Sequence, residues 1–396
     1  MADNGTVTGS GGTAADIHVE TTRTGWLGRA GDSVVGALIG LALFAGSLVL
    51  LAWNEGRAVD AMMALEAGAG LVTTVAADRV DPANEGRLVH VAGPVTVSGS
   101  PADPVFGVRP GTALRLERRV EMYQWRETAE TRTETSVGGT ETRTTTYRYT
   151  REWSDRSIDS GAFRQPEGHG NPPMLHRSTT LDAQNARVGA FALTPGQIRA
   201  VDATEPLLPD ADAALPPGFR REGEYLYRGE SQEAPRVGDL RVHFLVAPAD
   251  TLSVVAAQSG AGLAPYAGAR GHTIELVRPG VLSAEAMFAR AMEEEALLTW
   301  LLRAGGFVLM LVAVLLVTGP VAWLASVLPW FRPLVDGARF ALALVVALPL
   351  TLATIALAWL AHRPLLAAGL LAAAVIAAVA ARRLAPSRRQ PGVRPA

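Results

Sequence analysis

Long apolar runs are distributed very unevenly along this chain. One run, residues 33–53, lies near the start, and three more, residues 304–324, 338–360 and 364–381, crowd the last quarter. A helix rises about 1.5 Å per residue, so roughly 20 apolar residues cross a hydrocarbon core of about 30 Å. We predict an integral membrane α-helical protein with four transmembrane helices, one N-terminal and three C-terminal. Residues 54–303 then form a large β-rich α+β extramembrane domain between the first and second helices.

Within that domain, apolar residues recur at every second position after Arg87, which indicates strands. The clearest hairpin is predicted at Val120–Trp153, where Thr, Arg and Glu alternate on both sides of Gly138-Gly139. Its distal half is almost free of apolar side chains, so we expect a polar arm in solvent. Two interpretations stay open: a docking arm that pairs at its edge, or a solvated hairpin whose charges prevent aggregation. A stretch rich in Pro, Ala and Asp, residues 202–217, is a candidate boundary between two halves.

The segments that flank the spans also carry a pattern. Residues 54–71 continue the first span as a helix, and Ser283 is a candidate N-cap for a helix that runs into the second span. Residues 1–30 are rich in Gly, Thr and Ala, which predicts a disordered cytoplasmic tail. Residues 382–396 form a short basic tail.

The arginines predict the orientation, because basic residues near span ends stay on the cytoplasmic side. Arg23 and Arg29 precede the first span, and five arginines follow the last one: Arg382, Arg383, Arg388, Arg389 and Arg394. Both termini are therefore predicted to be cytoplasmic and residues 54–303 extracytoplasmic. Arg363, in the short loop before the last span, opposes this assignment.

The composition of the chain excludes several kinds of site and bears on its source and partners. With no cysteine in the chain, disulfides, thiolate nucleophiles and thiolate metal sites are excluded. All basic residues apart from the histidines are arginine, which suggests a GC-rich genome and hence a bacterial source and plasma membrane. The net charge of −2 gives no support for a nucleic-acid partner.

Charged residues gather where two helices leave the membrane. Glu293, Glu294 and Glu295 lie just before the second span, and Glu55 and Arg57 lie just after the first. They are candidates for pairing with each other or with lipid headgroups, and an acid–base site is a further reading. The plainer interpretation is that polar residues mark where the helices leave the hydrocarbon.

Other chemistry is sparse. His169 and His176 lie near Glu167, but no metal-ligand spacing supports a metal site there. His90 and His243 occupy similar places in two predicted strands. We find no nucleophile elbow, P-loop or dinucleotide fingerprint, so we predict no catalytic residue, no metal, no cofactor and no enzymatic activity.

The spans themselves show packing signals. Gly36 and Gly40 form a GxxxG pattern, a candidate for close helix packing inside the bundle, with homodimerisation left open. Ionisable side chains are absent from the middle of the apolar runs, which disfavours proton-coupled or ion-coupled transport.

Five segments carry a family resemblance, in the same order along the chain: Trp53–Val59, Asn84–Gly93, Val120–Glu127, Val237–Phe244 and Trp300–Met310. Together with the arrangement of spans, they resemble the transmembrane protein 43 (LUMA) family. The resemblance implies a membrane organiser that oligomerises, found in animals in the endoplasmic reticulum and inner nuclear membrane with lamins and other envelope proteins. It lends no catalytic residues, and a bacterial member has no nuclear envelope for those partners.

Two functional hypotheses remain. The first is a non-enzymatic membrane scaffold that self-associates and holds partner proteins, with membrane lipids around it. The second is a lipid-binding or lipid-sensing protein whose extracytoplasmic domain and surface carboxylates, Glu55 and Glu293–Glu295, contact headgroups. A channel or transporter is a weaker alternative.

Overall fold

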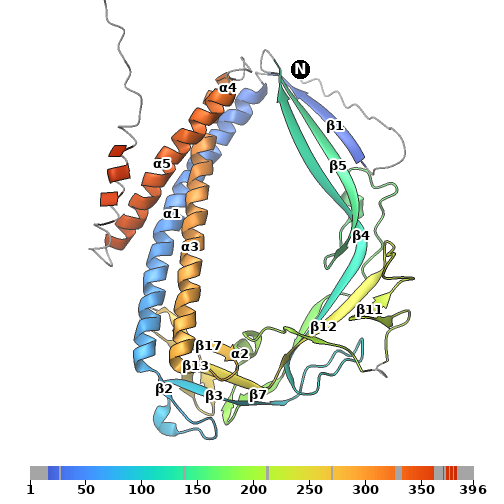
Figure 1. The fold of residues 1–396 in the computed structure, drawn as a ribbon, viewed down its shortest axis with the longest axis vertical. Coiled ribbons are helices and arrows are strands. Elements are labelled where there is room, and N and C mark those ends of the chain that lie inside the picture. The colour runs from blue at the N-terminus through green and yellow to red at the C-terminus, as the bar shows by residue number, and fades with distance from the viewer. Residues whose placement is uncertain are drawn as a thin grey trace, which may run out of the picture.

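The structure is a computed structural model, and it describes residues 17–25, 28–136, 140–210, 214–268, 271–325, 332–360, 369, 372–373, 375–377 and 379–380. Its helices and strands enclose a wide opening (Figure 1). A bundle of long helices forms one side, a two-stranded arm forms the other, and a compact β-rich part joins them at the bottom.

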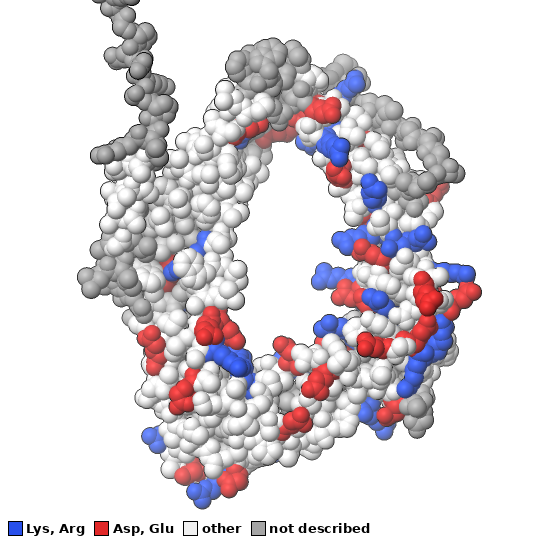
Figure 2. Space-filling model, viewed as in Figure 1, with Lys and Arg blue, Asp and Glu red and all other residues white. Residues whose placement is uncertain are grey.

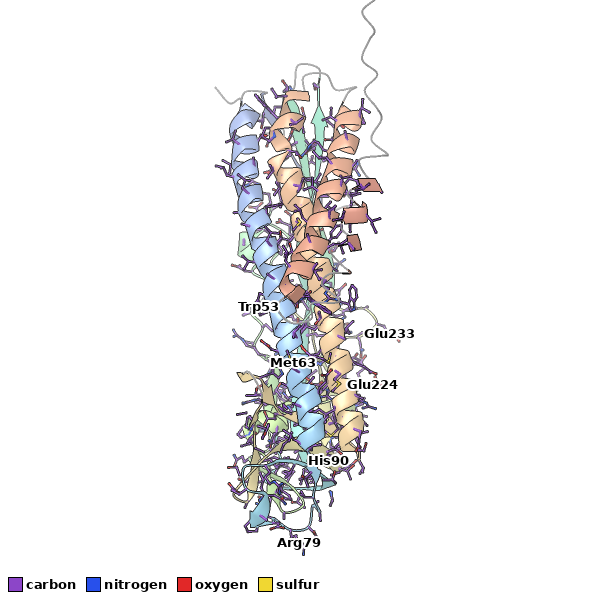
Figure 3. All side chains as sticks on the ribbon, turned by 90° about the vertical axis from the view of Figure 1, so that its left-hand side faces the viewer. Trp53, Met63, Arg79, His90, Glu224 and Glu233 are labelled. Carbon is purple, nitrogen blue, oxygen red and sulfur yellow. The ribbon has the colours of Figure 1, made fainter. Side chains whose placement is uncertain are left out.

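Four main helices build the bundle: α1 (Gly28–Leu71), α3 (Ala284–Val317), α4 (Gly319–Ala325) and α5 (Arg332–Leu360). α1 continues past Trp53 without a break, as predicted, and Figure 3 places Trp53 about midway along it. Ser283 caps α3 by accepting a hydrogen bond from the Ala286 amide. α3 ends at Val317, so the predicted second span is broken just before Gly319-Pro320.

The extramembrane part contains two larger sheets. The first has the order β1-β5-β4-β12-β11-β10, with β6 on β4 and β9 on β12, and the second has the order β17-β13-β14-β8-β7-β3-β2. A short pair, β15 and β16, and the helix α2 complete it. The bounds are β1 Ile17–Thr24, β2 Thr73–Thr74, β3 Leu88–Ser98, β4 Ala113–Thr135, β5 Glu141–Ser154, β6 Thr179–Asp182, β7 Asn185–Val188, β8 Phe191–Ala192, α2 Pro195–Arg199, β9 Glu205–Leu207, β10 Arg220–Glu222, β11 Tyr225–Arg228, β12 Leu240–Pro248, β13 Thr251–Ser259, β14 Gly262–Ala264, β15 Tyr266–Ala267, β16 Thr273–Ile274 and β17 Leu276–Pro279.

The predicted hairpin is confirmed as the arm formed by β4 and β5. Its register pairs Met122 with Ser154 at the base and Thr135 with Glu141 near the tip. Gly138 and Gly139 lie outside the described residues. Figure 2 shows Arg, Asp and Glu side chains along the arm, whereas the helix bundle across the opening is almost uncharged in its upper part. The arm is therefore polar along its length, as its sequence indicates.

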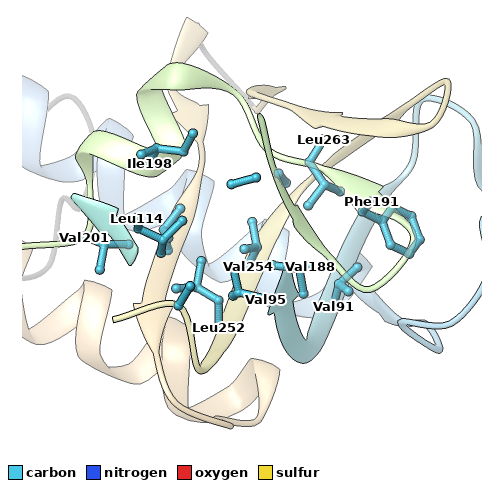
Figure 4. Close-up of a cluster of buried hydrophobic side chains, with 14 of the residues drawn as sticks. Val91, Val95, Leu114, Val188, Phe191, Ile198, Val201, Leu252, Val254 and Leu263 are labelled. Atoms are coloured by element: carbon cyan, nitrogen blue, oxygen red, sulfur yellow. The ribbon is translucent and has the colours of Figure 1, made fainter. Parts of the chain in front are cut away.

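The described residues form four hydrophobic cores, one of them inside the helix bundle around Leu51, Met310 and Ala347. Figure 4 shows the core of the second sheet, where Val91, Val188 and Phe191 are fully buried. A second core surrounds Phe106 between the strands of the first sheet, and a third packs Leu65 of α1 and Phe288 of α3 against the strands. Gly68 allows this third contact, since an added Cβ would lie 2.5 Å from Ile274 Cδ1. The helix bundle is thus fixed to the β-rich part at its base.

The structure corrects two predictions. Residues 17–24 were expected within a disordered tail, but they form β1, which pairs with β5 from Ile17–Arg148 to Thr24–Glu141. This part of the tail alternates β-branched and polar residues, so it matches an open strand edge. Residues 202–217 do not divide the domain into halves. β4 pairs with β12 and β3 with β13, so strands from before and after that stretch share both sheets.

The described residues contain three candidate membrane-spanning helices, Gly31–Leu71, Ala284–Val317 and Pro333–Trp359. The chain is therefore an integral membrane protein with one N-terminal and two C-terminal candidate spans and a large β-rich domain between them. Most of the predicted fourth span, residues 364–381, and the basic tail, residues 382–396, lie outside the described part of the chain.

Candidate functional site at the membrane boundary

The three long helices expose large apolar side chains around their circumference. Leu38, Val49, Leu301 and Leu348 are examples, each with nearly half or more of its surface exposed. A helix that is apolar on all sides and not covered by protein is suited to lipid rather than water. The bundle therefore presents a lipid-facing surface, and its lower boundary is where charged residues first appear.

The two glycines of the GxxxG pattern behave differently. Gly40 is buried against α3, and an added Cβ would lie 2.8 Å from Ala313 O, Leu316 Cβ and Val317 N. Gly36 has nothing within 4 Å of the same hypothetical atom. Within the bundle the motif therefore packs through Gly40 alone. Because α3 already covers Gly40, the two glycines are not both free to contact a second copy of the chain.

At the boundary, Glu55 of α1 and Arg303 of α3 form a buried ion pair. Arg303 Nε and Nη2 donate to the two Glu55 oxygens, each over 2.7 Å, and the Glu55 side chain is 0% exposed. Trp359 of α5 also donates its indole N–H to Glu55. One carboxylate therefore joins all three helices, and a paired charge is what a buried carboxylate requires.

A second pair lies on the outer side of the first. Arg57 donates through Nη1 to both oxygens of Glu295, at 2.9 Å for the longer contact. Asn54 donates to the Thr299 carbonyl over 3.2 Å. Two buried polar atoms in this cluster, Asn54 Oδ1 and Arg57 Nε, have no hydrogen-bond partner among the described residues. The cluster is therefore well paired in charge but not fully satisfied in hydrogen bonds.

Beside these pairs lies a groove lined by residues of α1, α3 and α5, with a cavity volume of about 160 Å³. Its lining combines apolar side chains with aromatic and charged ones. We call this the boundary groove; it is lined by Ala58, Val59, Met62, Glu295, Ala296, Thr299, Trp300, Arg303 and Trp359.

The predicted surface residues are thus brought together only in part. Arg57 and Glu295 form an ion pair across the two helices, whereas Glu55 pairs with Arg303. Glu294 instead pairs with Arg278 at 2.5 Å, and Glu293 is exposed. The contact of these residues with lipid headgroups stays a prediction.

Sequence reasoning missed Arg303, Trp359 and Thr299. Arg303 directly precedes the predicted second span, and an arginine at a span edge is a known signal for an interfacial partner. Trp359 lies at the end of the third span, where aromatic residues mark the interface. Their pairing with Glu55 was not visible because the partners are separated by 248 and 304 residues.

Three of the histidines pack against aromatic side chains of the β-rich part. His169 stacks on Tyr149 with ring centroids 4.0 Å apart, and His176 packs against Phe106 and Phe219. Within the described residues, no group of three His, Asp or Glu side chains is placed to hold a metal ion. His243 lies in β12 beside Tyr225, as a strand residue.

His90 fastens β3 to the start of α3. Its Nε2 lies 2.9 Å from the Leu282 carbonyl, and its Nδ1 lies 3.2 Å from Thr74 Oγ1. A carbonyl only accepts, so Nε2 carries the proton and Nδ1 accepts from the Thr74 hydroxyl. Burial lowers the pKa of His90, although the Leu282 hydrogen bond and the nearby Glu285 charge oppose that effect. Burial therefore favours the neutral ring.

Comparison with known proteins gives a consistent result. The sequence profile of the family described as Transmembrane protein 43 matches residues 122–364. Transmembrane protein 43 of Rattus norvegicus is 37% identical over 93% of this chain and 94% of its own length, and that of Homo sapiens is 36% identical over 89% and 90%. A Drosophila melanogaster homolog is 34% identical over 84% of this chain and 90% of its own. No solved structure matches.

These relatives are animal proteins. The comparisons therefore give no support to the expected bacterial source or to a bacterial plasma membrane as the location.

Proposed function

The chain belongs to the transmembrane protein 43 family, and on this premise we propose that it is a non-enzymatic multi-pass membrane scaffold that self-associates and holds partner proteins. The proposal assigns it no reaction. The observation that carries it is the open edge of the arm, because a strand with unpaired backbone groups is a site for another strand to pair.

The open edge can be located residue by residue. The amide and carbonyl of Trp125 face away from β5, since both bond to the side chain of Asn171. In an antiparallel ladder the same direction recurs at every second residue, so Thr131 and Thr133 also point their backbone groups outward. Between Glu127 and Thr135 this edge makes no backbone hydrogen bond to another described segment. Five successive outward positions are thus available for pairing.

The pairing of the arm with β1 bears on where the arm lies relative to the membrane. The arm tip reaches the N-terminal end of α1, where Glu141 and Arg143 share a hollow with Asp32 and Gly319 (Figure 1). A bilayer around the bundle would occupy the same height as the distal arm. Charged side chains and open backbone edges are not stable in hydrocarbon.

We therefore infer that in a bilayer the arm separates from β1 and lies in water with the rest of the extramembrane domain. The flanking arginines favour cytoplasmic termini on the other face. In this arrangement the β5 edge that β1 covers, opposite Glu141–Arg148, becomes a second edge for partners.

The test compares two substitutions at the open edge of the arm. Thr131→Pro removes an outward amide and should leave the β4–β5 ladder intact, since Pro is tolerated where the N–H is unpaired. Thr131→Ala is the matched control. Chemical cross-linking in native membranes should give oligomers for wild type and Thr131→Ala and fewer for Thr131→Pro. A wild-type protein that stays monomeric would refute the scaffold, whereas equal cross-linking of all three would refute the arm as the contact.

A further inference from the structure

We propose that the boundary groove binds the headgroup of one zwitterionic phospholipid. This goes beyond the scaffold, which needs only protein contacts. The position of the groove, its access from the bilayer and its charge all favour a lipid of the surrounding bilayer as the ligand.

The groove lies immediately outside the hydrocarbon. On α1 its lining begins at Ala58, five residues beyond the predicted end of the first span at Trp53. On α3 it ends at Arg303, directly before the predicted second span. At about 1.5 Å per residue, it occupies the first turns of helix above the membrane, which is the depth of lipid headgroups.

A lipid can enter this groove from the side. Trp300 lines it and is 65% exposed, and Leu297 and Leu301 on the same stretch of α3 are 62% and 61% exposed. The apolar lipid-facing surface is therefore continuous with the groove wall. A molecule already in the bilayer reaches the groove without passing through water.

The membrane end of the groove is suited to a phosphate. Arg303 uses Nε and Nη2 on Glu55, whereas its Nη1 makes no hydrogen bond to another described residue. The guanidinium lies over the rings of Trp300 and Trp359, 4.8 Å and 5.7 Å from their centroids. An arginine held in this way has its remaining N–H groups aimed in a fixed direction, and guanidinium N–H groups bind phosphate oxygens well.

The outer end is suited to a cation. Glu295 lines the groove there, and its carboxylate has lone pairs beyond those that accept from Arg57. The lining residues Ala58, Met62 and Ala296 offer apolar contacts for the methylene and methyl groups of a headgroup. A phosphate at Arg303 and an ammonium toward Glu295 match the order of charges in phosphatidylcholine.

The charge balance favours this lipid over an anionic one. The two arginines of the cluster, Arg57 and Arg303, are each paired with a carboxylate, Glu295 and Glu55. The site therefore has no excess positive charge to attract a net negative headgroup.

The experiment fills the groove without touching an ion pair. Ala296 is exposed and lines the groove, so Ala296→Trp blocks it, and Ala289→Trp adds the same bulk to an exposed position of α3 outside it. The full-length proteins are titrated in detergent with phosphatidylcholine and, separately, phosphatidylglycerol, and retained lipid is counted by native mass spectrometry. Thermal unfolding in lipid-free detergent shows that both variants are folded.

Wild type and Ala289→Trp should retain one phosphatidylcholine, and Ala296→Trp should bind it at least about tenfold more weakly. Equal retention by the two variants would overturn the site. Phosphatidylglycerol bound as tightly as phosphatidylcholine, and lost in Ala296→Trp, would overturn the assignment of a zwitterionic headgroup.

Discussion

Glu55 and Arg303 lie 248 residues apart in the sequence, yet two hydrogen bonds of 2.7 Å join them at the predicted ends of the first two spans. Because the Glu55 side chain is completely buried, its charge depends on this partner and on the Trp359 indole. The pair and the Trp359 indole together link the first span to the second and third.

This relationship predicts a strong asymmetry between single and double substitutions. Arg303→Gln should destabilise the protein by about 3–5 kcal/mol, since it leaves Glu55 buried and unpaired. Adding Glu55→Gln should recover a large part of that loss, because neither side chain is then charged. Thermal unfolding in detergent measures both, and a double variant no more stable than Arg303→Gln would contradict the buried pair.

The packing of α1 on α3 predicts that the two glycines of the GxxxG pattern differ. Gly40→Leu should destabilise the bundle by about 1–3 kcal/mol, because its side chain would overlap the α3 backbone. Gly36→Leu adds the same atoms in open space and serves as the control. Comparable melting temperatures for both variants would show that α1 and α3 are not packed at Gly40.

His90 predicts a pH dependence of stability. Burial lowers its pKa in the folded protein below the ordinary 6.5, with Glu285 the charge that opposes this shift. The unfolded chain therefore binds more protons in acid, so the free energy of unfolding should fall as the pH drops through 6.5. His90→Gln, which cannot titrate, should show a smaller fall between pH 7.5 and 5.5.

The measurement is the difference between wild type and His90→Gln in chemical denaturation at each pH, which cancels the carboxylates common to both. Identical pH profiles would show that His90 has the same pKa in both states.

The inferred separation of the arm from β1 predicts the outcome of a disulfide experiment, which the absence of native cysteine makes simple. Thr21 and Thr144 are directly paired in β1 and β5. With both changed to cysteine, no disulfide should form under mild oxidation in native membranes, because α1 crosses the bilayer between them. Efficient cross-linking there would place residues 17–24 and the domain on the same face.

Accessibility gives an independent check of the same topology. Thr145→Cys in β5 and Arg394→Cys near the C-terminus should react differently with a membrane-impermeant thiol reagent on sealed membranes. Equal labelling of the two positions would refute the separation of the domain from the C-terminal end.

Local sequence determined much of this architecture. The apolar runs identify three helices that the structure describes, since crossing a membrane depends on the composition of about 20 consecutive residues. The same holds for the arm, whose alternating Thr, Arg and Glu predicted both strands of β4 and β5. Each of these features repeats along the chain within one element, so a short window is enough to find it.

Tertiary structure alone decided which side chains from distant segments pair with each other. Arg303 and Trp359 come to Glu55 because three helices pack together, and the boundary groove is lined by residues of the same three helices. Likewise, residues 17–24 pair with the β5 edge as β1 in this structure, although their composition resembles a disordered tail. Contacts between distant segments depend on the packing of the whole chain, and no local pattern encodes which side chain will lie opposite another.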